Sequence, residues 1–144
     1  MSYATKQNLI DRYSEAALLL VAALASDASQ LDDDAIALAI SDADAVIDAN
    51  VRGRYAVPLS PVPAEIVGIS CALARYALHE NATSVPDQVK TGRDNAMALL
   101  AAIRDGDAVL DCAPAPSSDP AATAQAPEFA SDEPVMTRDK LASW

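Results

Sequence analysis

The feature that most constrains the fold is an amphipathic run between residues 33 and 51. Apolar side chains recur there at spacings of three or four residues, at Ile36, Ile40, Ala43, Ile47 and Val51. This period places them along one face of a helix. Asp residues occupy positions 32 to 34, where a helix cap and the helix dipole favour negative charge. The pattern predicts a long helix with one buried face, and hence a domain built by packing helices together.

A proline-rich segment interrupts the helical pattern after Gly53. Three prolines fall within six residues, at Pro58, Pro61 and Pro63. Proline lacks a backbone donor and pushes the residue before it toward extended conformations. We therefore expect an extended connector between two helices, with three apolar side chains able to pack on the domain: Val57, Leu59 and Val62.

Two further helices are expected after the connector. The first, from about residue 64 to 81, has an apolar stripe of Ile66, Ile69, Leu73, Tyr76 and Ala77. The second follows a capping-box-like Ser84–Asp87 and has an apolar stripe of Val89, Ala96, Leu100 and Ile103. Gly106 is well placed as its C-terminal stop.

The sequence before residue 32 predicts a helical segment that is followed by a loop. Thr5 is a plausible N-cap for a first helix through Tyr13, and strong helix formers continue to Ala25. The sequence leaves open whether these runs make one helix or two, and residues 26–29 are expected to form a loop. The predicted fold is all-α: a small bundle of about four main helices with an extended Pro-rich connector.

The chain divides into three parts. Residues 1–112 have the patterning of a helical domain. Pro, Ala, Ser and Thr dominate residues 113–127, which predicts a flexible linker. Residues 128–144 regain large apolar side chains, including the only Phe and the only Trp, and are expected to form a C-terminal docking arm.

Composition and charge disfavour several classes of protein. The net charge of −11 opposes affinity for nucleic acid phosphates or anionic membranes. The longest apolar run, residues 16–25, is about half the roughly 20 residues that span a bilayer. The N-terminus lacks the pattern of a signal peptide, and two cysteines make no disulfide framework. We expect a protein of a reducing cytosol with no membrane association.

No motif for catalysis or cofactor binding stands out. His79 is the only histidine, and no second His or Cys lies at metal-ligand spacing. The four glycines form no phosphate-binding loop, and no Ser occupies a nucleophile elbow. The Asp residues at 32–34 fit a capped helix better than a calcium loop. We expect a protein that is not an enzyme and binds neither cofactor nor metal.

Arg52, Arg54 and Tyr55 allow two interpretations. The arginines flank Gly53 at a helix end, where a cation interacts favourably with the helix dipole. Arg and Tyr are also enriched at protein interfaces, so the cluster is a candidate for a contact with another protein subunit as well. Both interpretations can hold together.

Four motifs, in order, resemble the head–tail connector (adaptor) proteins of Mu-like phages and prophages. They are Tyr3-Ala-Thr leading to Tyr13, Ile47-Asp48 followed by Gly53-Arg54-Tyr55 and Pro58-Leu59, Ala74-Arg75-Tyr76-Ala77-Leu78, and Met136-Thr-Arg-Asp-Lys-Leu141. The chain departs from the family in its Ala-rich second helix and in a shortened loop before Asp32. The resemblance covers nearly the whole chain outside residues 113–127.

The resemblance implies a helical adaptor that forms a ring under the portal protein, with a dodecamer implied by related adaptors. Such a ring extends the DNA channel, lets DNA pass without binding it specifically, and docks a tail-proximal neck protein. It implies a location in the virion neck, and in the host cytoplasm during assembly. The candidate interface residues are Arg52, Arg54, Tyr55, Phe129, Met136, Arg138, Leu141 and Trp144.

An alternative function is a small helical regulatory module that binds proteins through a C-terminal recognition peptide. The position of the gene, beside portal, capsid and tail genes or apart from them, would separate the two functions.

Overall fold

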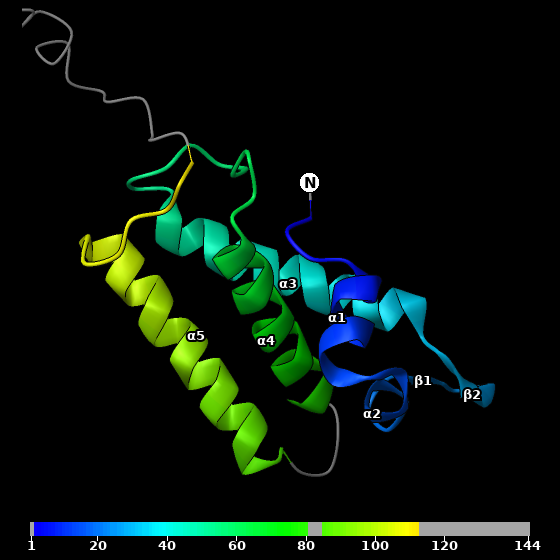
Figure 1. Cartoon of the computed structure of the whole chain (residues 1–144). Helices are drawn as coiled ribbons and strands as arrows, with labels where there is room; N and C mark the ends of the chain where they lie inside the picture. Colours follow the sequence, from blue (N-terminus) through cyan, green and yellow to red (C-terminus); the bar gives the residue numbers. More distant parts are fainter. Residues whose placement is uncertain (1, 81–84, 113–144) are drawn as a thin grey trace, which may run out of the picture.

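The computed structural model describes residues 2–80 and 85–112 of the chain. Three long helices form its body: α3 (Asp33–Val51), α4 (Ala64–Glu80) and α5 (Asp87–Asp105) (Figure 1). Two short helices, α1 (Lys6–Tyr13) and α2 (Glu15–Leu19), lie beside them. α4 packs against both α3 and α5, and α1 contacts α3 and α4. In the described residues, no helix is long and apolar enough to cross a membrane.

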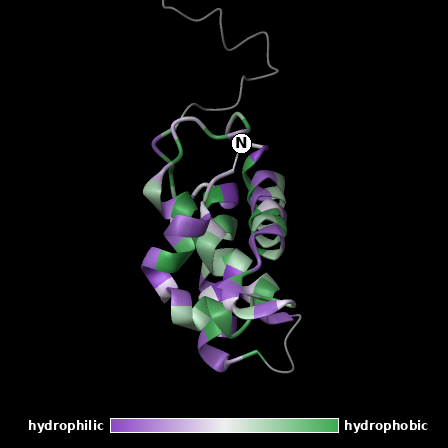
Figure 2. Ribbon diagram, turned by 90° about the vertical axis from the view of Figure 1, so that its right-hand side faces the viewer, coloured by the Kyte–Doolittle hydropathy of each residue, from purple (hydrophilic) through white to green (hydrophobic). Residues whose placement is uncertain are grey.

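The predicted stripe of α3 is confirmed, since all five of its members are buried. Ile47 and Val51 are fully buried, and Ile36 and Ile40 nearly so. The carboxylate of Asp32 accepts the backbone N–H of Ala35 at 3.0 Å, so the predicted N-terminal cap is also present. Figure 2 shows hydrophobic and hydrophilic segments alternating along the helices, as expected when each buries one face.

The predicted stripes of α4 and α5 are largely confirmed. Ile66, Ile69 and Leu73 are buried, whereas Tyr76 and Ala77 are half-buried. All four predicted residues of α5 are buried. Gly106 ends α5 in the left-handed region with φ of 97°, and its N–H donates to the Ala102 carbonyl at 2.9 Å.

The predicted capping box before α5 is wrong in its placement. The N-cap of α5 is Pro86, which has no side chain able to accept a hydrogen bond, and Ser84 lies outside the described residues. In the connector, Leu59 is buried and Val62 half-buried, but Val57 is 40% exposed rather than packed on the domain.

A small β-hairpin corrects the purely helical prediction. Strands β1 (Ala23–Leu24) and β2 (Asp27–Leu31) pair antiparallel, with an irregular register between Ala23 and Leu24. The helix expected to reach Ala25 stops at Leu19, and the loop expected at residues 26–29 is mostly strand. Leu31, at the end of β2, is buried, and so are Leu18 and Ala22, which precede the hairpin.

Candidate functional site

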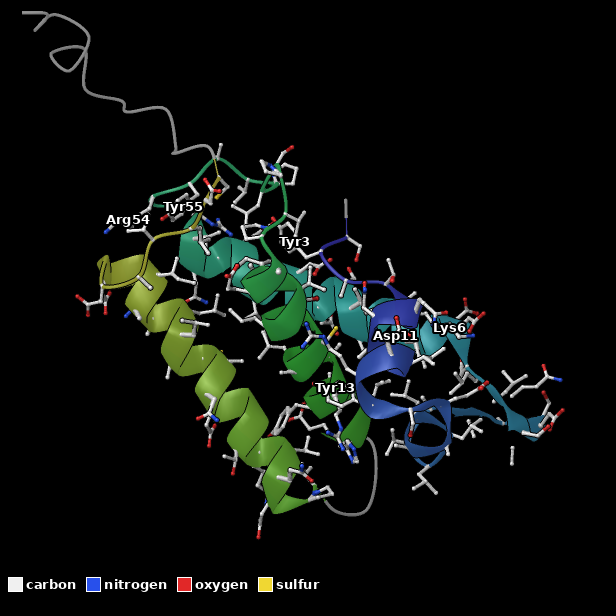
Figure 3. The ribbon with its side chains drawn as sticks, viewed as in Figure 1. Tyr3, Lys6, Asp11, Tyr13, Arg54 and Tyr55 are labelled. Carbon is white, nitrogen blue, oxygen red and sulfur yellow. The ribbon has the colours of Figure 1, made fainter. Side chains whose placement is uncertain are left out.

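Tyr55 joins the end of α3 to the chain that follows α5. Its side chain is only 6% exposed, and its hydroxyl accepts the backbone N–H of Leu110 at 2.9 Å (Figure 3). Leu110 is buried as well. The Tyr55 ring therefore serves its own domain, and any contact with another subunit at this cluster would fall on the arginines beside it.

Both arginines of the cluster are exposed and lie at helix C-termini. The Nε of Arg52 donates to the carbonyl of Asp48, in the last turn of α3, at 3.4 Å. Arg54 lies against Gly106 at the end of α5. The contact is so close that a Cβ built on Gly106 would lie 2.1 Å from the Nη1 of Arg54. The cation–dipole arrangement expected from the sequence is thus present, with Arg54 serving α5 rather than its own helix.

Tyr3 makes a second contact of the same kind. Its hydroxyl accepts the backbone N–H of Leu59, in the connector, at 3.1 Å and donates to the carboxylate of Asp48 on α3. Burial, followed by the hydrogen bond to Asp48, raises the pKa of Tyr3 to about 12. The N-terminal segment, α3 and the connector are therefore tied together at one side chain.

Asp44 anchors the N-terminal segment to the bundle. One carboxylate oxygen accepts the Ser2 hydroxyl at 2.8 Å and the Tyr3 backbone N–H at 3.0 Å. The other accepts the Ser70 hydroxyl of α4 at 3.0 Å. Sequence reasoning does not single out Asp44 or Asp48 for these contacts. The signal that it missed is their spacing of four, which puts both carboxylates on one side of α3.

The motif at residues 74–78 also contributes to the packing of the helices. The Arg75 guanidinium lies 4.3 Å from the centre of the Tyr13 ring and so joins α4 to α1. The Arg93 guanidinium of α5 lies 4.9 Å from the centre of the Tyr76 ring on α4. These cation–π contacts hold the helices at partly exposed positions.

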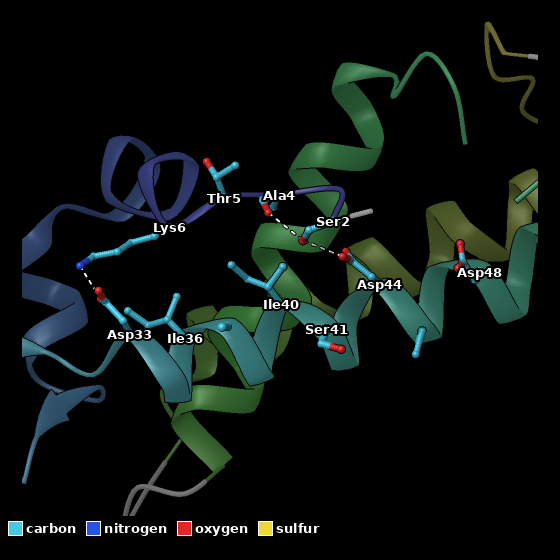
Figure 4. A pocket seen from close by; sticks show the side chains of 12 residues that line it. Ser2, Ala4, Thr5, Lys6, Asp33, Ile36, Ile40, Ser41, Asp44 and Asp48 are labelled. Atoms are coloured by element: carbon cyan, nitrogen blue, oxygen red, sulfur yellow. Dashed lines mark hydrogen bonds and ion pairs between the residues drawn. The ribbon is translucent and has the colours of Figure 1, made fainter. Parts of the chain in front are cut away.

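A groove of about 690 Å³ runs between the N-terminal segment and α3 (Figure 4). The small exposed residues Ala37, Ser41 and Ala45 line its α3 side, and the almost fully buried Ile36 and Ile40 lie beneath them. At one end, Lys6 forms an ion pair with Asp33. Toward the other end lie Asp44 and Asp48. The groove is thus apolar at its base and acidic along its length.

The remaining predicted interface residues lie outside the described residues: Phe129, Met136, Arg138, Leu141 and Trp144. Within the described part, no group of three His, Cys, Asp or Glu could hold a metal ion. Burial, with a smaller effect of Arg75, lowers the pKa of His79. Burial raises the pKa of the thiol of Cys71, which packs in the core as a small apolar side chain.

The chain is similar to known phage proteins. A family model described as Bacteriophage Mu, Gp36 matches residues 3–129. The Mu-like prophage FluMu protein gp36 of Haemophilus influenzae is 34% identical over 104 residues, which cover 72% of each chain. Gene product J of Escherichia phage Mu is 29% identical over 106 residues, which cover 74% of each chain. The motifs that fasten the N-terminal segment, the connector and the end of α5 thus lie within the matched region, and the chain belongs to the Bacteriophage Mu Gp36 family.

Proposed function

We propose that this protein is a structural head–tail connector of a Mu-like phage or prophage. Copies of it would form a ring beneath the portal protein, extend the DNA channel and dock a tail-proximal neck protein. Membership in a family of Mu-like phage proteins supports this role, as do the four motifs shared with head–tail adaptors.

The observation that carries the proposal is the position of the Gly53-Arg54-Tyr55 motif. The Tyr55 hydroxyl holds the chain at Leu110, close to the last described residue, so this point of the chain is fixed beside the end of α3. Arg52 and Arg54 are exposed at that same end. Exposed arginines beside a fixed point of the chain suit a subunit that must hold its partners in register, because Arg is enriched at interfaces.

Charge supports a ring through which DNA passes without being bound. The net charge is −11, and residues 33–51 contain five Asp and neither Lys nor Arg. Asp33, Asp34 and Asp42 are exposed on α3. A channel wall of this kind repels phosphates rather than holding them.

The proposed role needs no catalysis, cofactor or membrane. Its partners are the portal, copies of the same chain and a tail-proximal protein. A dodecamer is the copy number that related adaptors imply. The protein would act in the neck of the virion and reside in the host cytoplasm during assembly.

Disruption of the gene in the phage tests the proposal. We expect DNA-filled heads and free tails to accumulate separately, and a plasmid copy of the wild-type gene to restore joined particles. Cryo-electron microscopy of the neck should then show a ring of this helical domain between portal and tail. Normal virions without the protein would contradict the proposal and favour the regulatory module with a C-terminal recognition peptide.

A further inference from the structure

We infer that the groove between the N-terminal segment and α3 binds residues 135–144 of a neighbouring copy of the chain. The choice of a neighbouring copy rests on the proposed ring. The choice of groove and segment rests on their chemistry, which is independent of any portal.

The groove has the size and lining of a site for apolar side chains. Its volume of about 690 Å³ falls within the range of ordinary ligand pockets. On the α3 side, the exposed residues that line it between Ala37 and Ala45 are small, whereas Ile36 and Ile40 lie almost fully buried beneath them. Small side chains at Ala37, Ser41 and Ala45 leave room for large ones to enter from another chain.

The groove also presents negative charge to a cation. Asp44 accepts hydrogen bonds from two hydroxyls and one backbone N–H, and Asp48 accepts one from the Tyr3 hydroxyl. All of these donors are neutral. Among residues 2–80 and 85–112, the ion pairs include none to Asp44 or Asp48. Two carboxylates one helical turn apart therefore lie beside small apolar side chains with no cationic partner among the described residues, and an arriving Lys or Arg would gain a charge-assisted hydrogen bond.

Residues 135–144 carry the complementary chemistry. Arg138 and Lys140 are the only basic residues after Cys112, and they stand between Met136 and Leu141. Met and Leu suit the apolar surface at Ala37 and Ala45, while the two cations suit Asp44 and Asp48. Trp144 adds a side chain of the type that most often anchors an interface.

Chain length permits this contact between copies. Twenty-two residues separate Cys112 from Val135. At about 3.3 Å per residue their contour reaches about 70 Å, which is longer than the 27 Å or so that α3 spans. The contour is thus long enough for residues 135–144 to extend beyond the length of their own domain.

Photo-cross-linking of the full-length chain tests the inference. A photoreactive benzoylphenylalanine replaces Ser41, which is exposed and lines the groove, and the matched control carries it at Ala49, exposed on α3 but outside the groove. Equal amounts of light and heavy-nitrogen protein are mixed, irradiated and digested, both alone over a range of concentrations and with the cognate portal. We expect adducts between position 41 and peptides from residues 135–144 that combine light and heavy chains, and none from position 49.

A charge-reversal variant tests the chemistry. Arg138→Glu together with Lys140→Glu should lower the yield of this adduct about tenfold, which corresponds to about 1.4 kcal/mol. Adducts of a single isotope at every concentration would place the segment in its own groove and overturn the inference, as would the absence of any adduct with residues 135–144. Mixed-isotope adducts without portal binding would sustain the inference while contradicting the proposed function.

Discussion

The hydroxyl of Tyr55 accepts the backbone N–H of Leu110 at 2.9 Å, and both residues are buried. This contact joins the turn after α3 to the segment that follows α5, across 55 positions of sequence. Tyr3 does the same for the connector, where its hydroxyl accepts the N–H of Leu59. In both places a tyrosine hydroxyl accepts a buried backbone N–H that has no partner in a helix or sheet.

Replacing Tyr55 by Phe should destabilise the domain. The ring remains, but the buried N–H of Leu110 loses its acceptor, which costs about 1–3 kcal/mol. Urea unfolding monitored by circular dichroism measures the change. Tyr76→Phe is the control, because its half-buried ring keeps its contact with Arg93, and we expect less than about 0.5 kcal/mol there. Equal losses in the two variants would contradict a specific role for the Tyr55 hydroxyl.

Replacement by Ala should lower the free energy of unfolding much more at Asp44 than at Asp42, two aspartates of α3. Asp44 accepts three hydrogen bonds that hold the N-terminal segment and α4, so Asp44→Ala should cost about 1.5–3 kcal/mol. Asp42 is exposed two residues away, and the same change of charge and side chain there should stay within about 0.5 kcal/mol. Chemical denaturation gives both values.

Hydrogen exchange locates the effect of Asp44→Ala. The Tyr3 N–H donates to Asp44, so its protection should fall in Asp44→Ala and remain in Asp42→Ala. Unchanged protection of Tyr3 in both variants would show that the N-terminal segment is held by other contacts.

The stability contributed by Tyr3 should disappear at alkaline pH. Burial, and next the hydrogen bond to Asp48, raise its pKa from 10.0 in the unfolded chain to about 12 in the folded domain. A raised pKa means that the folded state binds the proton more tightly. The contribution is therefore complete below pH 10 and is lost as the pH rises toward 12.

Unfolding free energies of wild type and Tyr3→Phe, measured from about pH 9 upward, check this window. Wild type should be the more stable near pH 9, and the difference should shrink as the pH approaches 12. Other tyrosines and lysines titrate in both proteins and cancel in the comparison. A constant difference across the window would show that the Tyr3 hydroxyl does not titrate with folding.

Sequence patterning predicted the three long helices well because each buries a full stripe. The period at Ile36, Ile40 and Ile47 is long enough to specify both helix and face. The end of α5 was equally predictable, because helices often end at a residue with a left-handed backbone and glycine, here Gly106, adopts it without strain.

The hairpin at residues 23–31 was not predictable in the same way. Ala25 and Ser26 connect Leu24 to Asp27 without the Asn-Gly or Asp-Gly signal of a tight turn. Helix formers fill residues 15–25, so local propensity opposed the result, and tertiary packing of Leu18, Ala22 and Leu31 decided it. The contacts of Tyr3, Asp44 and Tyr55 were hidden for another reason: each joins residues more than 25 positions apart, and no local pattern encodes them.

The last prediction concerns DNA. The isolated protein should not bind duplex DNA at physiological salt, because its net charge is −11 and phosphate affinity depends on released counterions. A fluorescence anisotropy titration with a labelled duplex measures this directly. The double variant Asp34→Lys with Asp42→Lys changes two exposed positions of α3 and should gain weak, salt-sensitive affinity. Sub-micromolar binding by the wild type, weakened by added salt, would contradict the acidic channel and favour a regulator. In that case Arg52 and Arg54, exposed at the end of α3, would be the first residues to replace.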